Sequence, residues 1–162
     1  ELEKMRCEVL VIPCNTAHYY YQHICNSVSV PVLNMIELSA ERLYELGVSK
    51  VGILASPAVK KIGVFDADLR RFDLKASFVR DDESILNIIK AIKKGCLSKA
   101  LIKNFKLQLL RLTDECDSIL LACTELSSMM EYVPKQSTCL DTLDCLADKI
   151  VSESLISDVD RQ

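Results

Sequence analysis

Short apolar runs alternate with helical apolar patterns along the whole 162-residue sequence. Residues 9–13 form a continuous apolar run suited to a buried strand, and further short strands are predicted at residues 30–33, 51–55, 74–79 and 118–122. Between them, apolar residues recur at spacings of three and four, which predicts helices; one such stripe contains Ile85, Ile88, Ile89 and Ile92. Strands that alternate with helices are expected to pair in parallel. The sequence therefore predicts an α/β fold with a doubly wound parallel sheet.

Several helix boundaries are also marked in the sequence. A helix is expected over residues 16–27, and the last helix follows residues 138–140. Asp81 or Asp82 can cap the helix that carries the isoleucine stripe. Gly47 and Gly95 stand where helices are expected to end, because glycine readily adopts the left-handed conformation of a C-terminal cap.

Composition and charge exclude several classes of protein. With 49% hydrophobic residues the chain can bury a sizeable core, and a net charge of −3 gives no basic surface for nucleic acid. The pairs Lys60-Lys61 and Lys93-Lys94 are interpreted as solvated faces. No apolar run approaches the roughly 18 residues of a membrane span, and no signal peptide is predicted from these residues. The chain opens with Glu1, in what looks like the end of a helix, so we expect it to lack its true N-terminus.

The sequence contains eight cysteines but no C-x-x-C motif, so neither a zinc ribbon nor a thioredoxin-type redox pair is indicated. Only His18 and His23 are available to complete a metal site, and none is predicted. A disulfide scaffold is normally smaller and poorer in aliphatic residues. We therefore expect a reduced, cytoplasmic protein in which most cysteines are small buried apolar groups.

Two segments of the chain, residues 7–16 and 116–125, are similar to each other. Each has a cysteine, an acidic residue, an apolar strand and a second cysteine seven residues after the first. The second cysteines are Cys14 and Cys123, and a predicted helix follows each. Ligands bind at the carboxyl ends of the strands in open α/β sheets. Cys14 and Cys123 are therefore expected at equivalent functional positions of two related units.

A pair of cysteines in this setting suggests acid–base chemistry. The N-terminus of a following helix lowers the pKa of a thiol, which can then exchange protons near neutral pH. If two such groups face each other across one ligand, one removes a proton from carbon and the other returns a proton to the opposite face, which inverts a stereocentre. The alternative is that either cysteine is buried filler, the interpretation kept for the other six.

Four segments, taken in order, resemble the aspartate/glutamate/hydantoin racemase superfamily. Residues 13–18 and 122–126 are similar to its two cysteine motifs, and residues 30–36 and 51–55 to other family segments. Glu125, which follows the second Cys-Thr, favours the aspartate racemase branch. The resemblance implies a fold with two pseudo-symmetric lobes. The first and incomplete lobe comprises residues 1–36 and about 124–158, and the second about 37–123.

The resemblance implies a racemase that interconverts L- and D-aspartate, or a similar acidic amino acid, without cofactor or metal and as a homodimer. Cys14 and Cys123 match the catalytic acid and base. Asn15, Thr16 and Thr124 match positions that hydrogen-bond the substrate, although the threonines could instead cap helices. Glu125 could orient Cys123, meet the substrate ammonium, or be a first-turn acid. His18 could adjust the electrostatics near Cys14, but a histidine on the helix surface is the expected interpretation.

Two departures from the family pattern leave alternatives open. The family begins with a strand and a glycine-rich turn that have no counterpart here, and its Thr-x-Gly-Thr turn is replaced by residues 56–59, Ser-Pro-Ala-Val. Ser56 preserves a hydroxyl group for substrate binding, whereas the side chain of Val59 cannot donate a hydrogen bond. The alternatives are a catalytically inactive binding or structural module and another activity of the superfamily, such as hydantoin racemisation.

Overall fold

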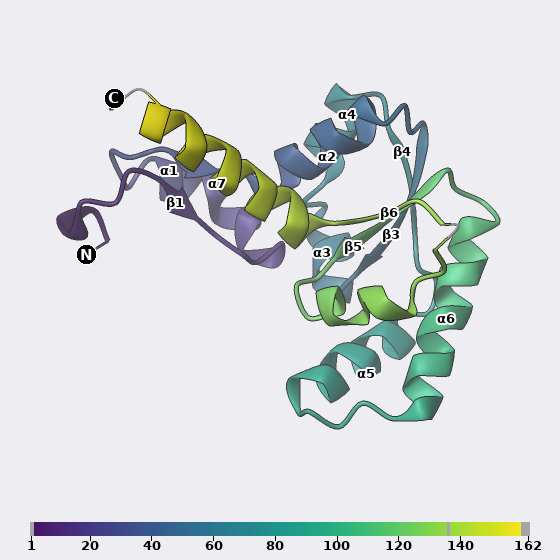
Figure 1. Ribbon diagram of the computed structural model, residues 1–162. Coiled ribbons are helices and arrows are strands. Elements are labelled where there is room, and N and C mark those ends of the chain that lie inside the picture. Colours follow the sequence, from purple (N-terminus) through teal and green to yellow (C-terminus); the bar gives the residue numbers. More distant parts are fainter. Residues whose placement is uncertain (1, 136, 160–162) are drawn as a thin grey trace.

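The computed structural model describes residues 2–135 and 137–159, with side chains in the last helix as far as residue 153. Its centre is a four-stranded sheet in which all strands are parallel, in the order β4-β3-β5-β6 (Figure 1). These strands are β3 (Lys50–Ala55), β4 (Lys75–Phe78), β5 (Ser118–Ala122) and β6 (Cys139–Asp141). A second, two-stranded parallel sheet pairs β1 (Leu10–Val11) with β2 (Val32–Leu33).

Helices cover both faces of the four-stranded sheet. One face is covered by α2 (Met35–Glu45), α3 (Pro57–Ile62) and α4 (Asp66–Arg71), the other by α5 (Asp82–Lys93), α6 (Lys99–Thr113) and the 3-10 segment η3 (Leu126–Tyr132). Alternation along β5 divides its side chains between the two resulting cores. Leu120 and Ala122 pack in the first core, whereas Ile119, Leu121 and Cys123 pack in the second. Cys123 therefore lies on the face covered by α5, α6 and η3.

Residues near both ends of the chain lie together, beside this sheet (Figure 1). The N-terminal part contains η1 (Glu3–Met5), β1, η2 (Thr16–Tyr20), α1 (Tyr21–Cys25) and β2. The long helix α7 (Thr142–Val159) follows β6 and packs against α2. Among the described residues, no helix is long and apolar enough to cross a membrane.

The helix boundaries agree with the local signals in the sequence. The side chain of Asp81 accepts a hydrogen bond from the backbone N–H of Ser84 and so caps α5. Gly47 and Gly95, just beyond the ends of α2 and α5, have φ values of +70° and +63°. This left-handed conformation is strained for residues with a Cβ, which is why glycine is favoured there.

The α/β class and the parallel strand pairing are confirmed, but several elements differ from the prediction. The predicted strand 9–13 contributes only Leu10 and Val11 to a ladder, because the strand with which it pairs in the described residues, β2, is equally short. The predicted helix 16–27 is divided into η2 and α1. The helices α3 and α4 were missed, since six residues are too few to show a helical apolar stripe. The proposed division into lobes stays a prediction.

Candidate active site

The carboxyl edge of the four-stranded sheet brings Cys123, Ser56 and Thr142 together. In the ladder between β3 and β5, Ala55 is opposite Ala122, so the next residues, Ser56 and Cys123, leave the sheet side by side. On the other side of β5, Leu121 is opposite Asp141, which places Thr142 at the same edge. This is the edge at which ligands bind in open α/β sheets.

The first cysteine motif is joined to this edge by a buried hydrogen bond. The Nδ2 atom of Asn15 donates to Oγ1 of Thr142 at 3.0 Å, and the two residues are 3% and 0% exposed. Cys14, directly before Asn15, is exposed. The Oδ1 atom of Asn15 is buried and has no hydrogen-bond partner within the described part of the chain. Segments 127 residues apart in sequence therefore meet where β6 ends.

Cys123, Glu125 and Lys93 form a hydrogen-bonded series. The Cys123 thiol donates to Oε2 of Glu125 at 2.9 Å, and Oε1 of Glu125 is 2.9 Å from Nζ of Lys93. Burial would raise the pKa of Glu125, but its hydrogen bonds to Cys123 and Lys93 lower the pKa below its usual value. Glu125 is thus an ionised carboxylate that accepts a hydrogen bond from the Cys123 thiol.

The pKa of Cys123 differs in direction from our expectation. Burial, together with the hydrogen bond and negative charge of Glu125, raises the pKa of the thiol to about 12. We expected a helix N-terminus to lower it, but η3 is a 3-10 segment that begins only at Leu126. A carboxylate in contact with a thiol disfavours the thiolate more than this segment stabilises it. At neutral pH Cys123 therefore holds its proton.

Lys93 is the site residue that the sequence interpretation missed. It was assigned to a solvated face, yet it forms an ion pair with Glu125, although 61% of its side chain is exposed. The hydrogen bond and negative charge of Glu125 raise the pKa of Lys93, and the negative charges that thiolates of Cys123 and Cys14 would carry raise it further. Both cysteines thus lie within electrostatic range of one ammonium group. One pattern in the sequence could have indicated this position. Lys93 follows Ile89, a residue of the apolar stripe, by four positions, and so lies on the same side of α5 as that stripe.

The remaining predicted residues occupy distinct environments. The hydroxyl of Ser56 accepts from the backbone N–H of Val59 at 3.4 Å and so caps α3. Thr16 and Thr124 are half-buried, and neither caps a helix, because Asn15 and Glu125 occupy the N-cap positions of η2 and η3. His18, expected on a helix surface, is instead only 7% exposed. In the described residues, no group of three or more His, Cys, Asp or Glu side chains is arranged to hold a metal ion.

The sequence profile of the Asp/Glu/Hydantoin racemases matches residues 1–150. The chain belongs to this family. Among curated proteins, the broad specificity amino-acid racemase RacX of Bacillus subtilis is 24% identical over 156 residues, which cover 96% of this chain and 68% of RacX. The resemblance inferred from the four segments is thereby confirmed.

Solved structures share the fold of this racemase-family chain. The aspartate racemase of Picrophilus torridus superimposes with a TM-score of 0.83 at 24% identity, over 94% of this chain and 64% of that enzyme. The glutamate racemase isoform RacE1 of Bacillus anthracis gives a TM-score of 0.72 at 19% identity, over 96% and 62%. The chain thus spans somewhat less than two thirds of the length of these structures.

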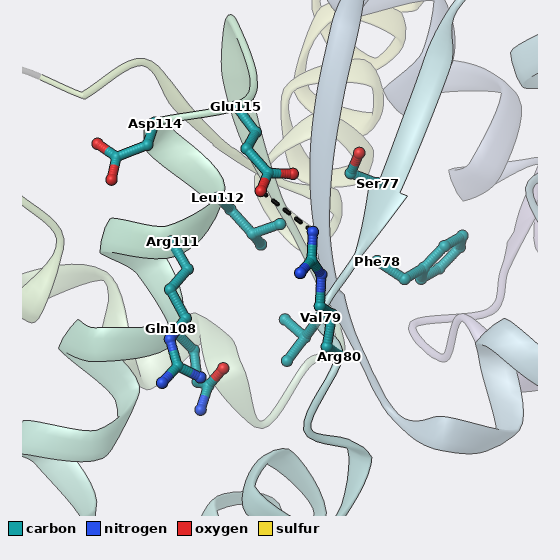
Figure 2. A pocket seen from close by; sticks show the side chains of 9 residues that line it. All are labelled: Ser77, Phe78, Val79, Arg80, Gln108, Arg111, Leu112, Asp114 and Glu115. Atoms are coloured by element: carbon teal, nitrogen blue, oxygen red, sulfur yellow. Dashed lines mark hydrogen bonds and ion pairs between the residues drawn. The ribbon is translucent and has the colours of Figure 1, made fainter.

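One cavity of this racemase-family chain lies apart from the candidate site. Its volume is about 520 Å³, and it lies between the end of β4 and α6, where Arg80 and Glu115 form an ion pair at 3.2 Å (Figure 2). Its lining residues are Ser77, Phe78, Val79, Arg80, Gln108, Arg111, Leu112, Asp114 and Glu115. None of them is among the candidate site residues, so the cavity adds nothing to the chemistry of the cysteine edge.

Replacement of Glu125 by glutamine is expected to lower the pKa of Cys123 from about 12, because it removes the negative charge that opposes the thiolate. Burial still raises the pKa, while the backbone of residue 125 and the charge of Lys93 still lower it. The measurement is the pH dependence of Cys123 alkylation by iodoacetamide, resolved by peptide mass spectrometry. At a fixed pH of about 9, labelling should become faster. Glu131→Gln, in the segment η3 that follows Glu125, is the matched control. An unchanged Cys123 profile in Glu125→Gln would show that Glu125 does not hold the thiol in its protonated form.

Proposed function

We propose that this chain is a cofactor-independent amino-acid racemase that interconverts L- and D-aspartate, or a similar acidic amino acid, with Cys14 and Cys123 as acid and base. The observation that carries the proposal is the convergence of the two cysteine motifs. The hydrogen bond from Asn15 to Thr142 joins the first motif to the edge where β5 delivers Cys123, and negative charge on either cysteine would raise the pKa of Lys93.

The protonated state of Cys123 supports a division of labour between the thiols. In one direction, the thiolate of Cys14 takes the Cα hydrogen as a proton, and the electron pair of the C–H bond remains on the substrate as a carbanion. The thiol of Cys123, with its pKa of about 12, then gives its proton to the opposite face and becomes a thiolate. The other enantiomer reacts with the two roles exchanged. Glu125 and its ion-pair partner Lys93 lie next to Cys123, whose sulfur becomes negatively charged when it gives up its proton.

Polar groups at the same edge suit an amino-acid substrate. The buried Oδ1 atom of Asn15, which has no hydrogen-bond partner among the described residues, is an acceptor that matches a substrate ammonium group. The half-buried hydroxyls of Thr16 and Thr124 are free of capping bonds and can donate to a carboxylate. Ser56 contributes less, because its oxygen already accepts from Val59, although its hydrogen remains available.

The division into lobes and the homodimer are part of the same proposal. We infer two pseudo-symmetric lobes, the first of residues 1–36 and about 124–158 and the second of about 37–123, with the first lobe less complete than in the relatives. The homodimer, the cytoplasmic location and the absence of a cofactor stay predictions. Because the chain spans 64% of the Picrophilus torridus enzyme, the activity has to be tested on this chain directly.

Incubation of the protein with L-aspartate in deuterated water is expected to replace the Cα hydrogen by deuterium and to form D-aspartate. Proton NMR follows the loss of the Cα signal, and chiral chromatography follows the second enantiomer. The double variant Cys14→Ser/Cys123→Ser defines the background. Exchange at that background by wild-type protein with an intact circular dichroism spectrum would rule out the racemase proposal.

A second candidate is an inactive racemase-like module that retains binding. It is favoured by the turn after β3, where Ser56 is engaged in capping α3 and Val59 contributes no polar side chain. For this candidate, calorimetry should detect aspartate binding while the Cα hydrogen does not exchange.

A further inference from the structure

His18 lies buried between the first cysteine and the start of α2. Its Nδ1 atom is 2.9 Å from the carbonyl oxygen of Cys14, and its Nε2 atom is 3.1 Å from the backbone nitrogen of Met35. A backbone N–H can only donate, so Nε2 has to be the unprotonated acceptor. Nδ1 therefore carries the hydrogen and donates it to Cys14. These two contacts together assign the neutral Nδ1–H tautomer.

The surroundings of His18 support the neutral form. Its ring stacks on Tyr21 at 5.8 Å with an interplanar angle of 9°, and the Tyr21 hydroxyl donates to the carbonyl of Val32 at 2.8 Å. Burial lowers the pKa of His18 more than its contacts with the backbone of Cys14 and Leu33 raise it, and burial also raises the pKa of Asp68, the carboxyl group that shares a small cavity with the histidine. A neutral ring is compatible with both contacts, whereas a protonated Nε2 would face the N–H of Met35.

Of the two segments that His18 contacts, the helix α2 is more deeply buried than the turn at Cys14. Met35 is the first residue of α2 and is fully buried, and Ile36 and Leu43 extend α2 into the main core. Cys14, in contrast, is exposed, and the strand before it has only two residues in its ladder. The carbonyl of Cys14 also accepts from the backbone N–H of Ala17 at 3.2 Å, within the same turn. The histidine thus joins this turn to the buried start of α2, in addition to the hydrogen bond by which Asn15 joins it to Thr142 at the start of α7.

We propose that His18 is a positioning residue for the first catalytic cysteine, which it fixes by joining the carbonyl of Cys14 to the N-terminus of α2. The consequence for catalysis rests on the proposed racemase function, but the bridge itself does not. A misplacement of about 1 Å in a reacting group can cost roughly 10²-fold in rate, so a lost bridge should lower turnover far more than it weakens substrate binding.

Two substitutions separate the two halves of the bridge. The amide of asparagine reaches the place of Nδ1, so His18→Asn can still donate to Cys14 but leaves Met35 without an acceptor. The amide of glutamine reaches the place of Nε2, so the Oε1 atom in His18→Gln can still accept from Met35 but nothing donates to Cys14. His23→Asn, which changes the exposed histidine of α1, is the matched control.

Amide hydrogen exchange by NMR tests the bridge without any reference to activity. In His18→Asn the Met35 amide should exchange at least about tenfold faster, while the Ala17 amide stays as in wild type. In His18→Gln the pattern should reverse. In wild type, the ¹⁵N shifts of His18 should show a protonated Nδ1 and a bare Nε2 at pH 7. The same response in both variants, or a protonated Nε2, would overturn the proposal.

Kinetics then test the catalytic consequence. For aspartate, kcat should fall roughly 10²-fold in His18→Gln with KM within about threefold of wild type, whereas His18→Asn should keep kcat within about threefold. Equal losses of kcat in both variants would refute the positioning role. If wild type itself does not exchange the Cα hydrogen, the racemase proposal fails, and the amide exchange pattern still decides whether His18 holds Cys14 in place.

Discussion

Cys14→Ser and Cys123→Ser are each expected to slow the interconversion of L- and D-aspartate by roughly 10²–10⁴-fold, the range that a positioned acid or base contributes. Serine keeps the shape of cysteine, but its hydroxyl is a far weaker acid than a thiol, so its conjugate base is not populated near neutral pH. The loss should not be the same for both enantiomers. If each cysteine works on one face of Cα, Cys14→Ser should impair proton abstraction from one enantiomer more strongly and Cys123→Ser from the other.

The measurement is deuterium incorporation at Cα, started separately from L- and from D-aspartate, in each variant. Cys96→Ser is the matched control, because Cys96 is also exposed but follows α5 and lies outside the candidate site. Equal losses from both enantiomers in both variants would contradict the two-base assignment, even if activity were lost.

Phe105→Ala is expected to lower the free energy of unfolding by about 3–5 kcal/mol, the range for truncation of a large buried aromatic residue. Phe105 of α6 is 0% exposed and packs in the core between α5, α6 and the sheet. Its loss removes buried apolar surface and leaves a cavity that close-packed neighbours fill only in part. This core also contains Cys123, so the substitution weakens the support of the candidate site.

Urea unfolding followed by far-UV circular dichroism measures this effect. Leu110→Ala is the matched control, because Leu110 lies on the same helix but is 58% exposed, and it should change stability by less than about 0.5 kcal/mol. Similar losses in the two variants would mean that α6 is not packed against the sheet through Phe105.

The parts of the fold that were predictable are those with strong local patterns. The strands β3 and β5 are continuous apolar runs, because helices cover both of their faces. The ends of α2 and α5 were predictable from Gly47 and Gly95, since left-handed backbone favours glycine wherever it occurs. The strands β1 and β2 are shorter than predicted, because an apolar run does not report how many residues its neighbour can pair with.

For the candidate site, the duplicated pattern around Cys14 and Cys123 was visible in the sequence, and so was the placement of Cys123 at a strand end. The protonation state of Cys123 was not visible in the sequence. Its pKa is raised to about 12 by burial and by Glu125, although a following helix suggested the opposite. Lys93 and His18 were both assigned to solvated surfaces, yet one binds Glu125 and the other joins Cys14 to Met35.

The amino-acid order was sufficient to predict the α/β class and the family and to single out Cys14 and Cys123 as candidates, because these depend on residue types at short, regular spacings. The contacts of Asn15 with Thr142, of His18 with Met35 and of Glu125 with Lys93 emerged from the folded chain alone. Such contacts depend on strand register and on burial, and these are properties of the whole packed molecule. The same long-range packing sets the pKa of the Cys123 thiol, because the free energy of the thiolate depends on its burial and on the charges and hydrogen-bonding groups around it.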